Sequence, residues 1–140
     1  MSASTALYTR EVLALATSLA AWPLEPALPL AGHARAPTCG STLDLGLALD
    51  AAGAIERIGL RARACAIGQA AAAIFADAAT GRTSADIAAA AGGIERWLEG
   101  GPAPDWPGFD AIAAARDYPA RHGAILLAWR AALVALDQRG

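Results

Sequence analysis

The chain has 140 residues and a formal net charge of −2; 56% of its residues are hydrophobic, but only 6% are aromatic. This length suits a single domain, residues 1–140, with a core built largely from alanine and aliphatic side chains. The acidic balance argues against a nucleic-acid partner, which would need a basic face. All 11 residues counted as lysine or arginine are arginine, so Schiff-base chemistry and a Walker A phosphate site are excluded.

The first half of the chain predicts one helix and two strands. Apolar residues at helical spacing indicate a helix over residues 6–21, and prolines at 23, 26 and 29 then indicate an extended linker. Residues 42–50 alternate between apolar and polar, as in a half-buried strand, and residues 55–64 predict a second strand. Because the turn between them is short and contains Gly53, we expect an antiparallel hairpin.

The second half predicts helices separated by turns rich in glycine and proline. The expected elements are a helix from Ala66 to Gly81, a short helix capped by Thr83 and Ser84 and ended by Gly92-Gly93, with 94–98 as one further turn, a mobile loop over 100–108, a short helix over 110–117 and a last helix from Pro119. Strands followed by helices favour the α+β class, in which a small antiparallel β-sheet packs against helices.

No segment has the pattern of a targeting sequence or a membrane span. Residues 1–10 lack the basic start of a signal peptide, and the longest uncharged runs, such as residues 12–24, are shorter than the roughly 20 residues that cross a bilayer. Two cysteines are too few for a disulfide framework. We therefore expect a cytoplasmic protein with reduced thiols and no membrane partner.

The two cysteines are the main candidates for chemistry. Cys39 lies between Pro37 and Gly40, just before the first predicted strand, and Cys65 begins the helix that follows the hairpin. A helix N-terminus favours the thiolate, and two thiolates can bind a metal if the fold brings them together. The alternative is that both cysteines are small buried hydrophobic residues.

Four segments resemble, in the same order, the motifs of the IscU/NifU N-terminal-like (SufU-like) family of iron–sulfur cluster assembly scaffolds. They are Ala-Pro-Thr-Cys-Gly-Ser at 36–41, Ala-Cys-Ala-Ile-Gly-Gln-Ala at 64–70, Ala-Thr-Gly-Arg-Thr at 79–83 and the segment 118–129 that opens the last helix. The resemblance covers nearly the whole chain and implies the fold of that family.

The resemblance also implies a site, from which this chain departs at two positions. In the family, three cysteines and an aspartate hold the cluster or a zinc ion, whereas this chain has Ala124 at the third cysteine position and Ser41 at the aspartate position. The metal ligands that the resemblance still implies are Cys39, Cys65 and His122. The residues that it implies as further contacts to the bound cofactor are Gly40, Ser41 and Arg121.

Two thiolates and one imidazole leave a coordination position open, because clusters and structural zinc both take four ligands. Such a site can hold a labile iron–sulfur cluster (2Fe-2S first), iron or zinc, or it can share a cluster between two protomers, so monomer and homodimer both stay open. His122 also lies on the apolar stripe of the last helix, where a histidine can be a core residue. His33, in the proline-rich linker, is expected to be a solvated loop residue.

Three functions follow from the resemblance. The first is a non-enzymatic scaffold or carrier that works with a cysteine desulfurase and apo iron–sulfur recipient proteins, with Cys65 as the first candidate to receive persulfide sulfur. The second is a degenerate paralogue that acts as an interaction or regulatory protein, and the third is a zinc-linked persulfide acceptor. Arg61, Arg63 and Arg121 are further candidates to converge near Cys65 and favour thiolates or an acidic partner.

Overall fold

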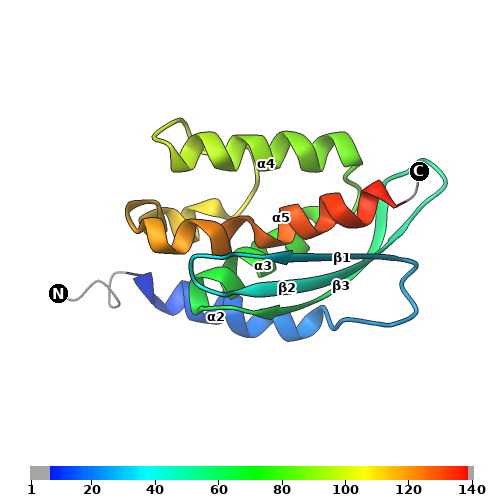
Figure 1. The fold of residues 1–140 in the computed structure, drawn as a ribbon, viewed down its shortest axis with the longest axis horizontal. Helices are drawn as coiled ribbons and strands as arrows, with labels where there is room; N and C mark the ends of the chain where they lie inside the picture. The colour runs from blue at the N-terminus through cyan, green and yellow to red at the C-terminus, as the bar shows by residue number, and fades with distance from the viewer. Residues whose placement is uncertain (1–6, 139–140) are drawn as a thin grey trace.

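The computed structural model describes residues 7–138 and contains a three-stranded antiparallel sheet with helices packed against it (Figure 1). The strands are β1 (Leu30–Arg35), β2 (Thr42–Leu49) and β3 (Ile55–Arg63). The helices are α2 (Arg10–Ser18), α3 (Ala66–Ala79), α4 (Ser84–Leu98) and α5 (His122–Asp137), with 3-10 turns η1 (Leu19–Ala21), η2 (Phe109–Asp117) and η3 (Pro119–Arg121). The predicted α+β class is confirmed.

The sheet has β2 at its centre, and the predicted hairpin is formed by β2 and β3. Leu43, Leu45 and Leu47 on β2 are all buried, whereas the residues between them face the other way, so the alternation in the sequence corresponds to the two faces. Helices α3 and α5 pack on the strands, α2 packs on α3, and α4 packs on α5. In Figure 1, α4 and α2 therefore lie at opposite edges of the molecule.

The core is centred on Trp129 of α5, which is fully buried. Its ring lies 5.2 Å from the ring of Phe75 on α3, 5.3 Å from that of Trp106 and 5.7 Å from that of Phe109. Trp106 belongs to the proline-rich segment 100–108, and its indole N–H donates to the carbonyl of Ile74 at 2.9 Å. This segment is thus a loop, as predicted, and one of its side chains is part of the core.

The predicted helices are present, with differences in length and type. The short helix expected over 110–117 is the 3-10 turn η2, and the last helix, expected from Pro119, begins with the 3-10 turn η3 before α5 starts at His122. The helix expected over 6–21 appears as α2 followed by η1, and residue 6 lies outside the described residues. Gly92-Gly93 does not end α4, which continues to Leu98. The reason is tertiary packing: Ile94 and Trp97, in the extra turn, are buried, and this burial outweighs the cost of two glycines in a helix.

Strand β1 was not predicted from the sequence. Residues 30–35 contain none of the β-branched or aromatic side chains that are typical of strands, and they follow three prolines. They form a strand because β2 supplies the pairing partner and α5 packs closely on the other side. The expectation for His33 was therefore wrong. His33 is in β1, where its Nδ1 lies 2.8 Å from Oδ1 of Asp44 on β2.

Helix α5 approaches the sheet so closely that Gly32 of β1 has no room for a side chain. A Cβ at Gly32 would lie 1.9 Å from the carbonyl oxygen of Ala131, which is a backbone atom and cannot rotate away. This contact sets the height of α5 above the sheet.

Within residues 7–138, no helix combines the length and apolar character that a bilayer span needs.

We expect Gly32→Ala to lower the free energy of unfolding by about 1–3 kcal/mol, because α5 must move away from β1. The matched control is Gly92→Ala, whose new Cβ would meet only the flexible end of Arg96, at 3.4 Å. Because this glycine is inside a helix, the control should gain about 0.5–1 kcal/mol. Urea unfolding of both variants checks the pair, and a Gly32→Ala protein as stable as the wild type would contradict this packing.

Candidate functional site

Cys39 lies in the tight turn that joins β1 to β2, and its side chain is exposed. Two backbone hydrogen bonds close the turn: the Ala36 N–H donates to Ser41, and the Gly40 N–H donates to Ala36, both at 2.8 Å. Gly40 has a φ of +73°, which a residue with a side chain rarely adopts, and the space around it is open. The turn therefore holds the thiol at the surface in a defined position.

Ser41 is the nearest polar neighbour of this thiol. Its side chain is largely buried, and its Oγ lies 3.1 Å from Sγ of Cys39, within hydrogen-bonding distance. This hydrogen bond is the main reason why the pKa of Cys39 is below that of an ordinary thiol, and the positive charge of Arg121 acts in the same direction. Ser41 thus has a contact to the Cys39 sulfur, although it offers no carboxylate.

Cys65 is the N-cap residue of α3, as expected, and its side chain is half-buried. Its backbone is extended, and its carbonyl accepts the first hydrogen bond of the helix, from Gln69 at 2.9 Å. Thr42 pairs with Arg63 in the sheet, so β2 begins and β3 ends at the same edge. The two cysteine-bearing turns, 26 positions apart in the sequence (65 − 39), therefore meet at that edge.

Arg121, in the turn before α5, connects the two cysteines. Its pKa is raised first by a hydrogen bond to Tyr8, whose oxygen lies 3.4 Å from Nη2, and also by its proximity to the sulfurs of Cys65 and Cys39. Its Nε is buried and has no hydrogen-bond partner among residues 7–138. The guanidinium group is thus close enough to both thiols to interact with them electrostatically, and its Nε donor is unused among residues 7–138.

Tyr8 is the site residue that sequence reasoning missed. It comes from the segment before α2 and lies 113 positions from its partner, Arg121. No motif marks it, because it follows no recognisable spacing and only the fold brings it to the site.

The position of the family's third cysteine is also at this edge, although it holds an alanine. Ala124 is buried, and both its Cβ and that of Ala64 lie within 3.1 Å of where Gly68 would carry a Cβ. Residue 124 therefore packs beside the turn that carries Cys65. Its neighbour Gly123 packs against Ala36, which belongs to the turn that carries Cys39.

His122 is the first residue of α5, and its ring is already engaged. Its Nε2 lies 2.7 Å from the carbonyl oxygen of Arg116, so the nitrogen carries a proton and donates it. Only Nδ1 is left for a metal. Among residues 7–138, no three His, Cys, Asp or Glu side chains lie close enough together to hold a metal ion, so His122 as the third ligand stays a prediction.

The remaining arginines of the expected cluster do not surround the thiols. Arg61 and Arg63 are exposed on β3, on the face of the sheet opposite the core, whereas Arg121 interacts electrostatically with both thiols.

Comparison with known proteins relates this geometry to solved structures. No family model matches the sequence, and no curated protein matches it either. The fold is similar to a nitrogen-fixing NifU-like protein (N-terminal) from Brucella abortus, with a TM-score of 0.85 and 27% identity, covering 94% of this chain and 93% of that one. The chain has the fold of the IscU/NifU N-terminal-like family. The resemblance seen in the sequence motifs is thereby confirmed.

Two more solved structures share the NifU-like fold. One is a putative iron–sulfur cluster assembly scaffold protein for the SUF system from the thermophile Fervidobacterium islandicum AW-1, with a TM-score of 0.80, 17% identity and coverage of 95% of this chain and 98% of that one. The other is a hypothetical protein with a TM-score of 0.67 and 23% identity, covering 90% of this chain and 96% of that one. At these identities the two structures establish the fold only.

The Ser41 contact predicts the reactivity of Cys39. In a Cys65→Ser background, where Cys39 is the remaining thiol, Ser41→Ala should raise the pKa of Cys39 towards that of an ordinary thiol. Alkylation by iodoacetamide, measured against pH, should then shift to higher pH and slow several-fold at pH 7, because the thiolate is the nucleophile. The control is Thr38→Ala in the same turn, which should leave the profile unchanged. Equal profiles for both variants would show that Ser41 does not tune this thiol.

Proposed function

We propose that the chain is a scaffold or carrier for iron–sulfur cluster assembly and that it holds its cargo through Cys39 and Cys65. The observation that carries this proposal is the meeting of both cysteine-bearing turns with Arg121 at one edge of a NifU-like fold. The proposal adds a cytoplasmic location, where thiols stay reduced, and a role in binding and handing over a cluster rather than in catalysis.

The donor set suits a cargo that must leave again. A cluster takes four soft ligands, and this chain offers two thiolates, with Nδ1 of His122 as a third candidate. The missing ligands can come from a small thiol or from the same two cysteines of a second protomer, which would complete four thiolates in a homodimer. Incomplete ligation by one chain therefore favours a labile cluster, of the 2Fe-2S type first, with iron or zinc as other cargoes.

Sulfur for the cluster comes, in this proposal, from a cysteine desulfurase that carries a persulfide. The Cys39 thiolate attacks the outer sulfur of that persulfide; a new S–S bond forms on Cys39, the donor's S–S bond breaks, and the donor leaves as a thiolate. We favour Cys39 over Cys65 for this step, because its thiol is exposed and its pKa is lowered. The positive charge of Arg121 would stabilise either sulfur anion.

The test of this function is the iron and acid-labile sulfide content of protein purified and reconstituted without oxygen. Iron and sulfide in equal amounts, with a broad visible absorption band, are expected for the wild type. The Cys39→Ser/Cys65→Ser variant should lose both, while circular dichroism shows an unchanged fold. Retention of the cluster by this variant would contradict the proposed ligands.

Two other outcomes would favour the alternative functions. Zinc without sulfide, together with faster desulfurase turnover, would indicate a zinc-linked persulfide acceptor. A metal-free protein that resists reconstitution but binds the desulfurase would indicate an interaction or regulatory protein. The two departures, Ala124 and Ser41, are the observations that keep this last function in view.

A third thiol at position 124 should strengthen cluster binding. Ala124→Cys places a sulfur beside the turn of Cys65, so the reconstituted cluster should survive a chelator several-fold longer than in the wild type. Ala132→Cys, also buried on α5, is the matched control and should leave the lifetime unchanged. Equal lifetimes in both variants would mean that position 124 does not face the cargo.

A further inference from the structure

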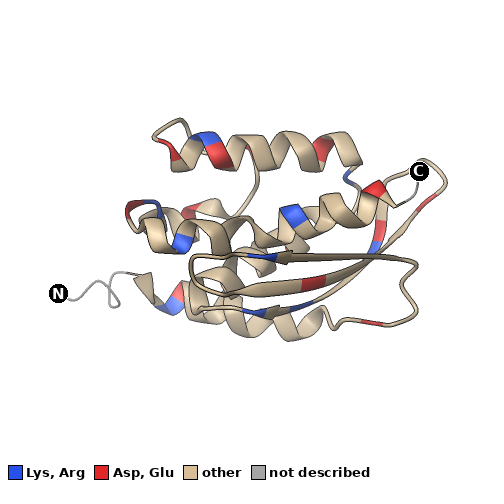
Figure 2. Cartoon of the chain, in the orientation of Figure 1, with Lys and Arg blue, Asp and Glu red and all other residues tan. Residues whose placement is uncertain are grey.

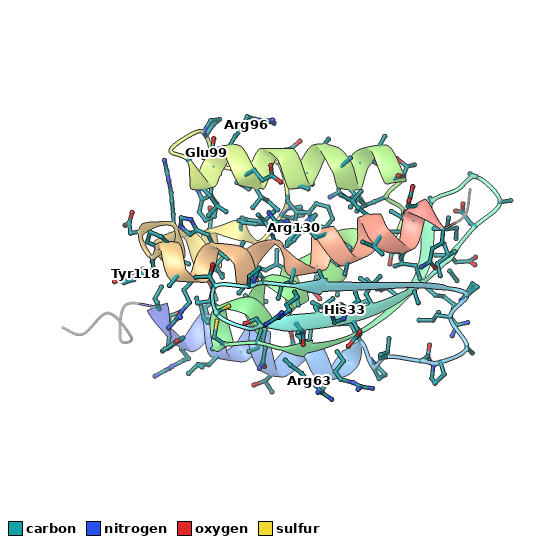
Figure 3. The ribbon with its side chains drawn as sticks, in the orientation of Figure 1. His33, Arg63, Arg96, Glu99, Tyr118 and Arg130 are labelled. Atoms are coloured by element: carbon teal, nitrogen blue, oxygen red, sulfur yellow. The ribbon has the colours of Figure 1, made fainter. Side chains whose placement is uncertain are left out.

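A basic surface lies on the outer face of the sheet, next to the cysteine-bearing turns. Arg35 of β1, Thr42 of β2 and Arg63 of β3 form one row across the sheet, and His33, Asp44 and Arg61 form the next row. All three arginines are exposed. In Figure 2, blue segments on β1 and β3 accordingly flank one red segment on β2. We call Arg35, Arg61 and Arg63 the sheet arginines; Figure 3 labels Arg63 together with His33.

The sheet arginines are not neutralised by ion pairs within the described part of the chain. Among residues 7–138, Arg57 forms an ion pair with Glu25 and His33 is hydrogen-bonded to Asp44, and neither pair includes a sheet arginine. Asp44 is thus engaged by His33. Three like charges on neighbouring positions repel one another, so their grouping does not serve the stability of the fold. The chain as a whole is acidic, which makes this basic surface a local feature.

Within residues 7–138, no helix packs over this half of the outer face. Helices α3 and α5 contact the core face, and the segment that leads into β1 covers the far half, where Leu28 packs on Gly46 and Pro23 packs on Gly59. Along the β3 edge, beside Arg61, runs an open groove of about 450 Å³ with an apolar lining that includes Leu19 and Leu24. The surface therefore combines free positive charge with an adjacent apolar groove.

The sheet arginines are also adjacent to the thiols in the chain. Arg63 is two residues from Cys65, and Thr42, between Arg35 and Arg63, is three residues from Cys39. A protein seated on this face would therefore have its edge at both thiols. This is the placement that a partner needs if it delivers sulfur to one of them.

We propose that the sheet arginines dock an acidic face of the sulfur-donating cysteine desulfurase. The inference rests on the proposed function and adds the surface and the chemistry of recognition to it. Charge complementarity selects a partner that is negative where it meets this face, and opposite charges speed the encounter. A protein fits better than a nucleic acid, because the surface has one acidic residue at its centre, Asp44, and lacks the aromatic side chains on which bases stack.

The test measures binding of the chain to the desulfurase of the same organism by surface plasmon resonance at low and high salt. The triple variant Arg35→Glu/Arg61→Glu/Arg63→Glu should weaken binding by about tenfold or more at low salt, mainly through the association rate. It should also lose most of the salt dependence. The control is Arg10→Glu/Arg96→Glu/Arg130→Glu, three exposed arginines on α2, α4 and α5, which changes the net charge equally away from the sheet and should bind within about twofold of the wild type.

Several results would overturn the docking surface. They are equal weakening by both triple variants, no weakening by either, absence of wild-type binding to the desulfurase, and tighter binding to a DNA oligonucleotide than to the desulfurase. Iron and sulfide content after chemical reconstitution, which needs no desulfurase, is measured on the same variants. A sheet-arginine variant that takes up a cluster but does not bind the desulfurase supports the surface. Failure of the wild type to take up a cluster counts separately against the scaffold function.

Discussion

The close packing of α5 against the sheet and against α3 is the constraint on which the site depends. Helix α5 contacts β1 at Gly32, α3 at Gly68 and the Cys39 turn at Gly123, and at Gly32 and Gly68 a side chain would bring atoms closer than 3 Å. These three glycines let the beginning of α5 approach both cysteine-bearing turns. Buried Trp129 then fixes the helix in the core, about two turns further along. The result is that the charge of Arg121 acts on both thiols.

The same arrangement places a positive charge near two thiols. Each thiol comes from a turn at the sheet edge, one exposed and one half-buried, and the buried side of the site is lined by small residues such as Ala64 and Ala124. Arg121 provides a fixed positive charge, held by Tyr8. Such a site suits anionic sulfur, and the outer sheet face beside it carries the positive charges that would attract an acidic donor.

The sequence was sufficient to predict the local elements. It was not sufficient to predict the strand and the contacts that depend on long-range packing. The hairpin, the start of α3 at Cys65 and the cap at Thr83 follow from alternation, period and capping chemistry, all of which are local. The strand at 30–35 could not be predicted, because its alanines and glycine gain their conformation from pairing with β2 and packing under α5. The contact of Tyr8 with Arg121 was equally hidden, because no local pattern marks a partner 113 residues away. The motif resemblance implied a site with Cys39, Cys65 and Arg121; the cysteine-bearing turns lie at the same end of the sheet and Arg121 interacts with both thiols, while their role as a site stays a prediction.

The measurement that tests the central claim most directly is native mass spectrometry of the reconstituted protein, kept free of oxygen. It reads out the mass of the cargo and the number of chains that share it. The account predicts a species heavier by an intact iron–sulfur cluster, on one chain or between two, which disappears when Cys39 or Cys65 is replaced by serine. Only the mass of the bare chain, or a cluster mass that persists in the double variant, would contradict the account.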